Sequence, residues 1–208
     1  MRSKTMIRAL LMMAVSGSLM SFSGRAQTTS DTNPQLTTEL VGQRYCTGDA
    51  DLDGVLLKLR LVYRNTGTSP LILYKGSTDV SQIIVRKTAD SSPEVNSHLS
   101  WYSDRPWTTV EASSLRKLFV VLQPNTTFET RTSTRVFVTR DDLAHVQGAV
   151  ESGDHYLQVT IPTWLGSQEL ADAIQQKWRS KGILSHDAVT SLPMKFTIAK
   201  QRTIADCP

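Results

Sequence analysis

The chain has 208 residues, of which 23 are basic and 19 acidic, and its formal net charge is +4. Four of the basic residues lie in the first 26 residues, which contain no acid, so residues 27–208 hold 19 charges of each sign and are formally neutral. This balance argues against a strongly basic domain, and we therefore expect no binding to nucleic acid.

The N-terminal segment 1–26 has the pattern of a cleavable export signal. Three basic residues precede an apolar run at 9–22, which is interrupted by Ser16 and Gly17 and is shorter than the roughly 20 residues of a membrane-spanning helix. Small residues before the expected site predict cleavage after Ala26. We expect a periplasmic or secreted protein with no stable membrane anchor, and the alternative is a retained N-terminal anchor.

The mature chain divides into a short leader and one domain. Residues 27–38 are rich in Thr, Ser, Asp, Asn and Gln, which predicts a flexible leader, and residues 39–208 suit a single domain. The two cysteines are Cys46 and Cys207, and an oxidising compartment favours one disulfide between them. Such a bond would tie the C-terminus to the first strand region. Two free thiols are the alternative.

Short strands dominate the predicted domain. From Val55 to Arg64, apolar residues alternate with Lys58, Arg60 and Arg64, which is the period of a half-buried strand. Turn-forming residues at 65–70 lead into a strand at 71–75. Further strands are predicted at 82–87, 117–123, 127–132, 134–139, 155–161 and 194–199. This pattern indicates an all-β fold, an antiparallel sandwich of about seven to nine strands.

One helix is expected at Ser167–Lys181, inserted before the last strand. Leu170, Ile174 and Trp178 fall four residues apart, and the first residue of the segment is a suitable N-cap. We expect this helix to cap an edge or an end of the sandwich. A second, short helical turn is predicted at 141–147.

Three carboxylates near the first strand raise the question of a calcium site. Asp49, Asp51 and Asp53 alternate and are followed by Gly54, as at the start of a calcium loop. The twelfth position of such a loop should be acidic, but it is Arg60, and a strand is predicted where the exiting helix should follow. We therefore interpret the segment as an acidic turn. A calcium site of another kind built from the three carboxylates is the alternative.

No catalytic motif is evident in the sequence. The segment 185–187 reads Ser-His-Asp, but consecutive side chains diverge and cannot form a catalytic relay. The histidines are scattered without zinc-ligand spacing, at His98, His145, His155 and His186. The mature chain has no nucleophile elbow and no phosphate-binding glycine loop. We predict no cofactor and assign no catalytic residue.

An aromatic cluster at 101–107 is the candidate binding surface. On a loop, Trp101, Tyr102, Arg105 and Trp107 could stack on a sugar or on the apolar surface of a partner. The alternative is that the tryptophans fill the core of the sandwich or cover its rim.

Two short segments resemble the immunoglobulin-like sandwich domains of exported bacterial proteins. Residues 61–67, LVYRNTG, are similar to a strand that ends in an Asn-Thr-Gly turn, and residues 152–159, SGDHYLQV, are similar to the turn and tyrosine that open a late strand. The resemblance implies an immunoglobulin-like sandwich. Gln158 stands where true immunoglobulin domains have their second core cysteine, so an inter-sheet disulfide is not implied. The family has no shared active site, and no functional residues carry over.

These features predict a non-enzymatic binding or structural module outside the cytoplasm, whose edge or loops contact another protein or a cell-surface component. The alternative is an extracytoplasmic hydrolase in which residues such as His98, Asp104 or His155 converge only in the fold.

Overall fold

The computed structural model describes residues 33–48, 52–75, 82–98, 118–141, 143–164 and 166–205. The expected export signal at 1–26 and residues 27–32 of the leader lie outside these ranges. Among the described residues, no helix is long and apolar enough to cross a membrane.

The described part of the chain is mostly β and holds twelve strands and one helix. In chain order the elements are β1 (Gln35–Thr47), β2 (Leu52–Arg64), β3 (Leu71–Tyr74), β4 (Gln82–Arg86), β5 (Pro93–His98), β6 (Phe119–Leu122), β7 (Thr127–Thr139), β8 (Gly153–Ile161), α2 (Gln168–Trp178), β9 (Ile183–Leu184), β10 (Val189–Thr190), β11 (Met194–Ile198) and β12 (Ile204–Ala205). The predicted all-β fold class is confirmed.

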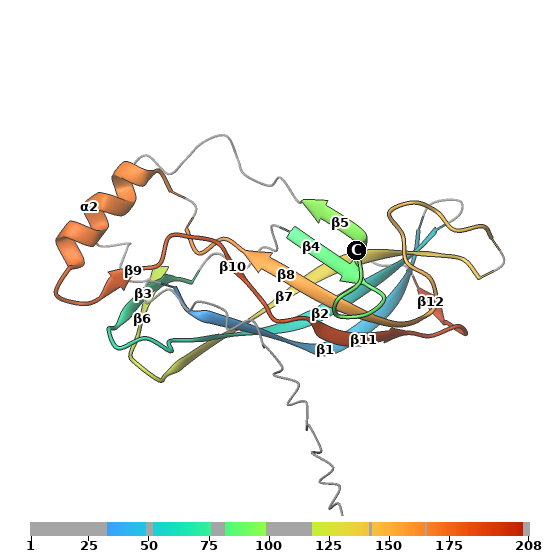
Figure 1. The fold of residues 1–208 in the computed structure, drawn as a ribbon, viewed down its shortest axis with the longest axis horizontal. Coiled ribbons are helices and arrows are strands. Elements are labelled where there is room, and N and C mark those ends of the chain that lie inside the picture. The colour runs from blue at the N-terminus through green and yellow to red at the C-terminus, as the bar shows by residue number, and fades with distance from the viewer. Residues whose placement is uncertain are drawn as a thin grey trace, which may run out of the picture.

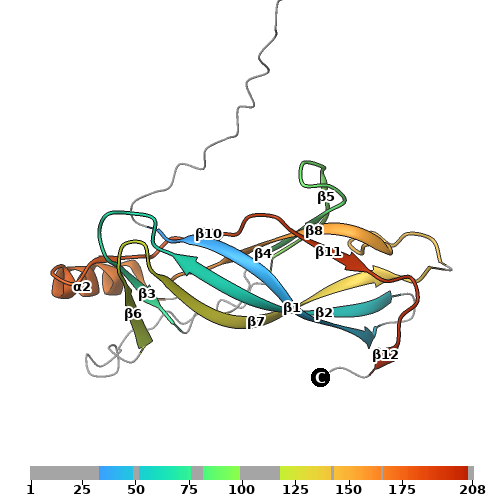
Figure 2. The same cartoon turned by 90° about the horizontal axis from the view of Figure 1, so that it is seen from below.

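The largest layer, which we call the long sheet, has the strand order β12-β1-β2-β7. Its three long members, β1, β2 and β7, have 13 residues each and pair antiparallel, whereas β12 joins β1 in parallel. The three long strands run side by side through the molecule (Figures 1 and 2). On β2 the predicted alternation holds, because Leu57, Leu59 and Leu61 are fully buried whereas Lys58 and Arg64 are exposed.

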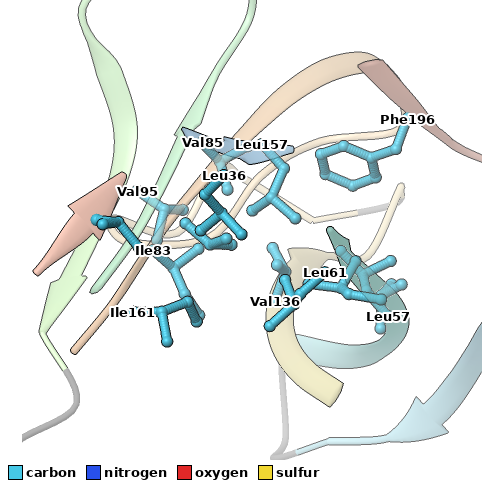
Figure 3. Packing of buried hydrophobic residues seen from close by; sticks show 14 of the residues in the cluster. Leu36, Leu57, Leu61, Ile83, Val85, Val95, Val136, Leu157, Ile161 and Phe196 are labelled. Atoms are coloured by element: carbon cyan, nitrogen blue, oxygen red, sulfur yellow. The ribbon is translucent and has the colours of Figure 1, made fainter. Parts of the chain in front are cut away.

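A second sheet covers the inner face of the long sheet. It has the order β10-β8-β4-β5, and β11 also pairs with β8. Side chains from both sheets meet in one hydrophobic core, in which Leu57 and Val136 of the long sheet face Ile83 and Leu157 of the second sheet (Figure 3). Full burial of each such side chain contributes roughly 1.5–3 kcal/mol to folding, so this interface is the main source of stability.

A third, small sheet of order β6-β3-β9 extends one end of the sandwich, and α2 packs on it (Figure 1). Ser167 caps α2 by accepting a hydrogen bond from the Leu170 amide, as predicted. The buried Ile174 and Trp178 attach the helix to an aromatic cluster. In this cluster the rings of Phe119 and Trp178 pack edge to face, with their centroids 5.4 Å apart. The helix therefore covers an end of the sandwich, as expected.

The structure differs from the sequence-based expectations in several places. The first strand begins at Gln35, within the expected leader at 27–38, because Leu36 is buried in the core. The two strands expected at 127–132 and 134–139 form the continuous β7. Four strands rather than one follow α2, and three of these have only two residues. The described residues of 141–147 form turns and no helix.

Candidate binding face

The aromatic surface predicted from the sequence cannot be placed. Trp101, Tyr102, Arg105 and Trp107 all lie outside the described residues, as does Asp104. Of the predicted disulfide, Cys46 is fully buried in β1 and Cys207 lies outside the described residues. Both hypotheses stay predictions.

Of the three candidate calcium ligands, only Asp53 belongs to the described part of the chain. Its carboxylate is buried between two arginines, with one oxygen 3.2 Å from Nε of Arg140 and the other 3.4 Å from Arg202. The Arg202 guanidinium also donates to Ser152, whose hydroxyl donates to Asp141 at 2.5 Å. Both Asp53 oxygens are thus engaged by cations. Asp49 and Asp51 lie outside the described residues, so calcium binding stays untested.

A polar cleft of about 410 Å³ opens beside this network. It is lined by Thr139, Arg140, Asp141, Leu143, Glu151, Ser152 and Lys200. Its two carboxylates pair with residues outside the lining: Glu151 lies 3.6 Å from His145, and Asp141 lies 3.9 Å from Arg202. No histidine of the described chain contacts Ser152, and no group of three or more metal-ligating side chains occurs there.

His155 is fully buried on β8 rather than directed into a cleft. Its Nδ1 lies 2.8 Å from the Glu94 carboxylate, and its Nε2 lies 2.8 Å from the Glu151 carbonyl oxygen. Both ring nitrogens of His155 are therefore engaged by oxygen atoms. The ring also packs against Phe196, with centroids 5.8 Å apart. This arrangement ties β5 to β8. Beyond its placement in β5, nothing is described of His98.

The outer face of the long sheet carries a concentration of positive charge, and we call it the basic face. Strand register places its outward side chains in rows across β1, β2 and β7. From one end of the sheet to the other, these rows are Arg44–Leu56–Arg135, Gly42–Lys58–Ser133, Glu39–Arg60–Arg131, Thr37–Val62–Glu129 and Gln35–Arg64–Thr127. The face therefore holds six cations and two carboxylates, although residues 27–208 are formally neutral.

The two carboxylates of the basic face both approach Arg60. Glu39 lies 2.9 Å and Glu129 3.9 Å from its guanidinium, and these contacts raise the pKa of Arg60, the Glu39 hydrogen bond most strongly. Within the described residues, Lys58, Arg64 and Arg131 have no carboxylate within 4 Å. Among the described residues, Lys58, Arg64 and Arg131 therefore carry the charge of the face that no nearby carboxylate neutralises.

A groove of about 500 Å³ is hollowed into the centre of the basic face. It is lined by Val41, Lys58, Leu59, Arg131, Thr132 and Ser133. The groove follows the row with the smallest side chains, since Gly42 and Ser133 flank Lys58. A register shift between Leu40 and Gly42 makes Val41 the extra residue of a bulge, and half of its surface is exposed. The groove thus combines two cations, a hydroxyl and an apolar side chain.

Sequence reasoning did not identify the basic face. It placed Lys58, Arg60 and Arg64 on the exposed parity of one strand, which is correct. It could not show that Arg44, Arg131 and Arg135 come to lie beside them, because a single sequence does not give strand register.

No protein-family model matches the chain, and no curated protein or solved structure matches it significantly.

Proposed function

We propose that this protein is an exported, non-enzymatic binding or structural module, and that its basic face contacts another protein or a cell-surface component. The single observation that carries the proposal is the gathering of six cations against two carboxylates on one face of a formally neutral domain. Potentials of one sign on a surface guide and orient the association of partners with the opposite charge.

Two further features of the basic face support binding. Arg60 and Arg131 lie directly opposite each other on neighbouring strands, an arrangement that costs folding free energy. Val41 and Phe137 expose 50% and 41% of their surface on the same face. Arginine beside exposed apolar and aromatic side chains is the composition found at protein interfaces.

Affinity capture with matched variants tests this function. The mature protein 27–208 is compared with the double variant Lys58→Glu/Arg64→Glu on the basic face, and with Lys177→Glu/Arg179→Glu on α2, which changes the net charge equally. We expect one set of binding partners to be retained by the wild type and the α2 variant and lost by the face variant. Equal capture by all three proteins would contradict a role for the basic face.

The exported state is tested separately. Cell fractionation followed by N-terminal sequencing should recover the mature chain outside the cytoplasm, beginning at Gln27. Recovery of the uncleaved chain in the membrane fraction would support the retained anchor instead.

The polar cleft at Arg140 and Ser152 is the observation that favours the alternative of a hydrolase. Ser152 donates a hydrogen bond to the Asp141 carboxylate and accepts one from Arg202, so Asp141 would be the base of such a site; among the described residues no histidine is hydrogen-bonded to Ser152. Turnover of generic ester, peptide and glycoside substrates would support this alternative if Ser152→Ala or Asp141→Asn abolished it. We expect no turnover by the wild type.

A further inference from the structure

In the described part of the chain, the outer edge of β7 has backbone hydrogen-bonding groups that no strand pairs with. β7 is the last strand in the order of the long sheet and pairs with β2 along its whole length. On the side away from β2, the Phe137 carbonyl accepts from Val150 and the Thr139 amide donates to Val150. Because edge-facing groups alternate along a strand, those of residues 127, 129, 131 and 133 point the same way. Within the described chain, no strand pairs with them.

This edge lacks most features that keep natural edge strands from pairing. β7 has 13 residues without Pro or Lys, and its register with β2 has no bulge. It is rich in β-branched threonine, which favours strand pairing. Thr127, Glu129, Arg131 and Ser133 are all exposed. Their charges are thus the main determinant of which strand this edge accepts.

The sequence of the edge is complementary to itself. We propose that a second copy of this chain pairs antiparallel with β7 about a two-fold axis at Thr130. In that register Glu129 of each copy lies opposite Arg131 of the partner subunit, and Thr127 lies opposite Ser133 of the partner subunit. Each of these opposed pairs exchanges both backbone hydrogen bonds, because their N–H and C=O groups face the edge.

The charges select this register over its neighbours. If the β7 strand of the second copy is shifted by two residues in one direction, Arg131 lies opposite Arg131 of the partner subunit. A shift by two residues in the other direction places Glu129 opposite Glu129 of the partner subunit. Like charges directly opposite one another destabilise a strand pair, whereas opposite charges stabilise it. A shift by one residue is excluded, because it would require backbone N–H and C=O groups of β7 that already form hydrogen bonds with β2.

The dimer joins two long sheets into one. Because opposed side chains lie on the same side of a sheet, the basic faces of the two copies form one continuous surface. Strand pairing at an edge buries less surface than a standard protein interface, so the dimer is weak and depends on concentration. This inference concerns association between copies and does not rest on the proposed function.

Sedimentation velocity of the mature protein, at concentrations up to about 1 mM, tests the dimer. We expect the wild type to shift from monomer to dimer as concentration rises. Glu129→Arg and Arg131→Glu should each weaken dimerisation by about tenfold or more, because each substitution opposes like charges at both symmetry-related contacts. An equimolar mixture of the two variants should dimerise again, since every opposed pair then combines opposite charges.

Ser133→Pro provides a test that does not alter charge. It removes an N–H that faces solvent in the monomer, a position where a strand tolerates proline, and it should prevent dimerisation while thermal unfolding stays cooperative. Lys58→Glu lies on the basic face away from the edge and should leave dimerisation unchanged. A wild type that stays monomeric at every concentration would overturn the proposal. So would a dimer that tolerates all three β7 substitutions, or a variant mixture that stays monomeric.

Discussion

The Asp53 carboxylate lies 3.4 Å from the Arg202 guanidinium, and both side chains are nearly inaccessible, with 3% and 5% of their surface exposed. Asp53 belongs to β2, whereas Arg202 lies between β11 and β12, so the ion pair joins the start of the long sheet to the C-terminal segment. The Arg202 guanidinium also lies 6.0 Å from the centroid of the Tyr45 ring on β1. The pair therefore fixes the segment between β11 and β12 against the two central strands.

Replacing Asp53 with Ala should destabilise the protein strongly. The substitution leaves Arg202 buried without its carboxylate, and loss of one partner of a buried ion pair typically costs about 3–5 kcal/mol. Urea unfolding of Asp53→Ala and of Glu39→Ala measures the difference, because Glu39 pairs with Arg60 in an exposed position. Comparable losses in the two variants would contradict the structural role of the Asp53–Arg202 pair.

Replacing Asn65 with Ala should disrupt the turn after β2. The fully buried Asn65 side chain donates to the Ser69 and Leu122 carbonyls at 2.8 and 2.9 Å and accepts from the Gly67 amide at 2.9 Å. We expect a loss of roughly 2–3 kcal/mol, because the substitution removes one buried and two partly buried hydrogen bonds and leaves two carbonyls without this donor. Thr66→Ala, at an exposed neighbouring position, is the control, and chemical denaturation that gave equal midpoints would refute this role.

Elements with a strong local pattern were predictable from the sequence. Strand β2 was evident from its alternation, and α2 from its N-cap Ser167 and from the spacing of Ile174 and Trp178, which are buried. The strand β5 was missed because its sequence, PEVNSH, is mostly polar. β5 forms because its backbone pairs with β4, in a register that places Val95 opposite Val85. That pairing is a tertiary interaction, which local propensity does not encode.

The candidate site was less predictable than the fold. The basic face requires side chains from β1, β2 and β7 to meet, and Arg44 and Arg131 are 87 positions apart in the sequence. Likewise, the pairing of Asp53 with Arg202 crosses most of the chain. A single sequence shows that such residues are charged, but the fold decides whether they neutralise one another or form an exposed surface.

Replacing Tyr63 with Phe should stabilise the protein by about 1 kcal/mol. The Tyr63 hydroxyl is buried beside Phe128 and has no hydrogen-bond partner among the described residues, so Phe removes an uncompensated polar group and keeps the ring. Burial also raises the pKa of Tyr63 far above its ordinary value. Wild-type stability should therefore fall as the pH rises past about 10, where tyrosine in the unfolded chain ionises first, and Tyr63→Phe should lose less. Thermal melts across this range measure both effects.

The ion pair between Asp154 and Lys195 should contribute less to the free energy of unfolding as the pH falls. Lys195 lies 2.7 Å from the Asp154 carboxylate, and its hydrogen bond, followed by that of Thr197, lowers the pKa of Asp154. Because the pKa of Asp154 is lower in the folded chain than in the unfolded chain, its ion pair stabilises the fold at pH values above the ordinary carboxyl pKa. This contribution is lost as the pH falls through the lowered pKa of the folded state. Both groups are about half exposed, so the effect is small. An NMR titration should show the Asp154 pKa rising in Lys195→Gln, and an unchanged pKa would contradict this cause.

The predicted disulfide between Cys46 and Cys207 has a specific structural support. β12 pairs in parallel with β1 and places Ala205, two residues before Cys207, directly opposite Cys46. If the bond forms, the unreduced mature protein should resist alkylation in denaturant, and peptide mass spectrometry should recover the two cysteines in one linked species. Cys207→Ser should then unfold at lower temperature than the oxidised wild type and at the same temperature as the reduced wild type. Because the bond closes a loop of most of the domain, the chain-entropy model gives a loss of about 4–5 kcal/mol as an upper value. Alkylation of both cysteines without reductant would instead support the alternative of two free thiols.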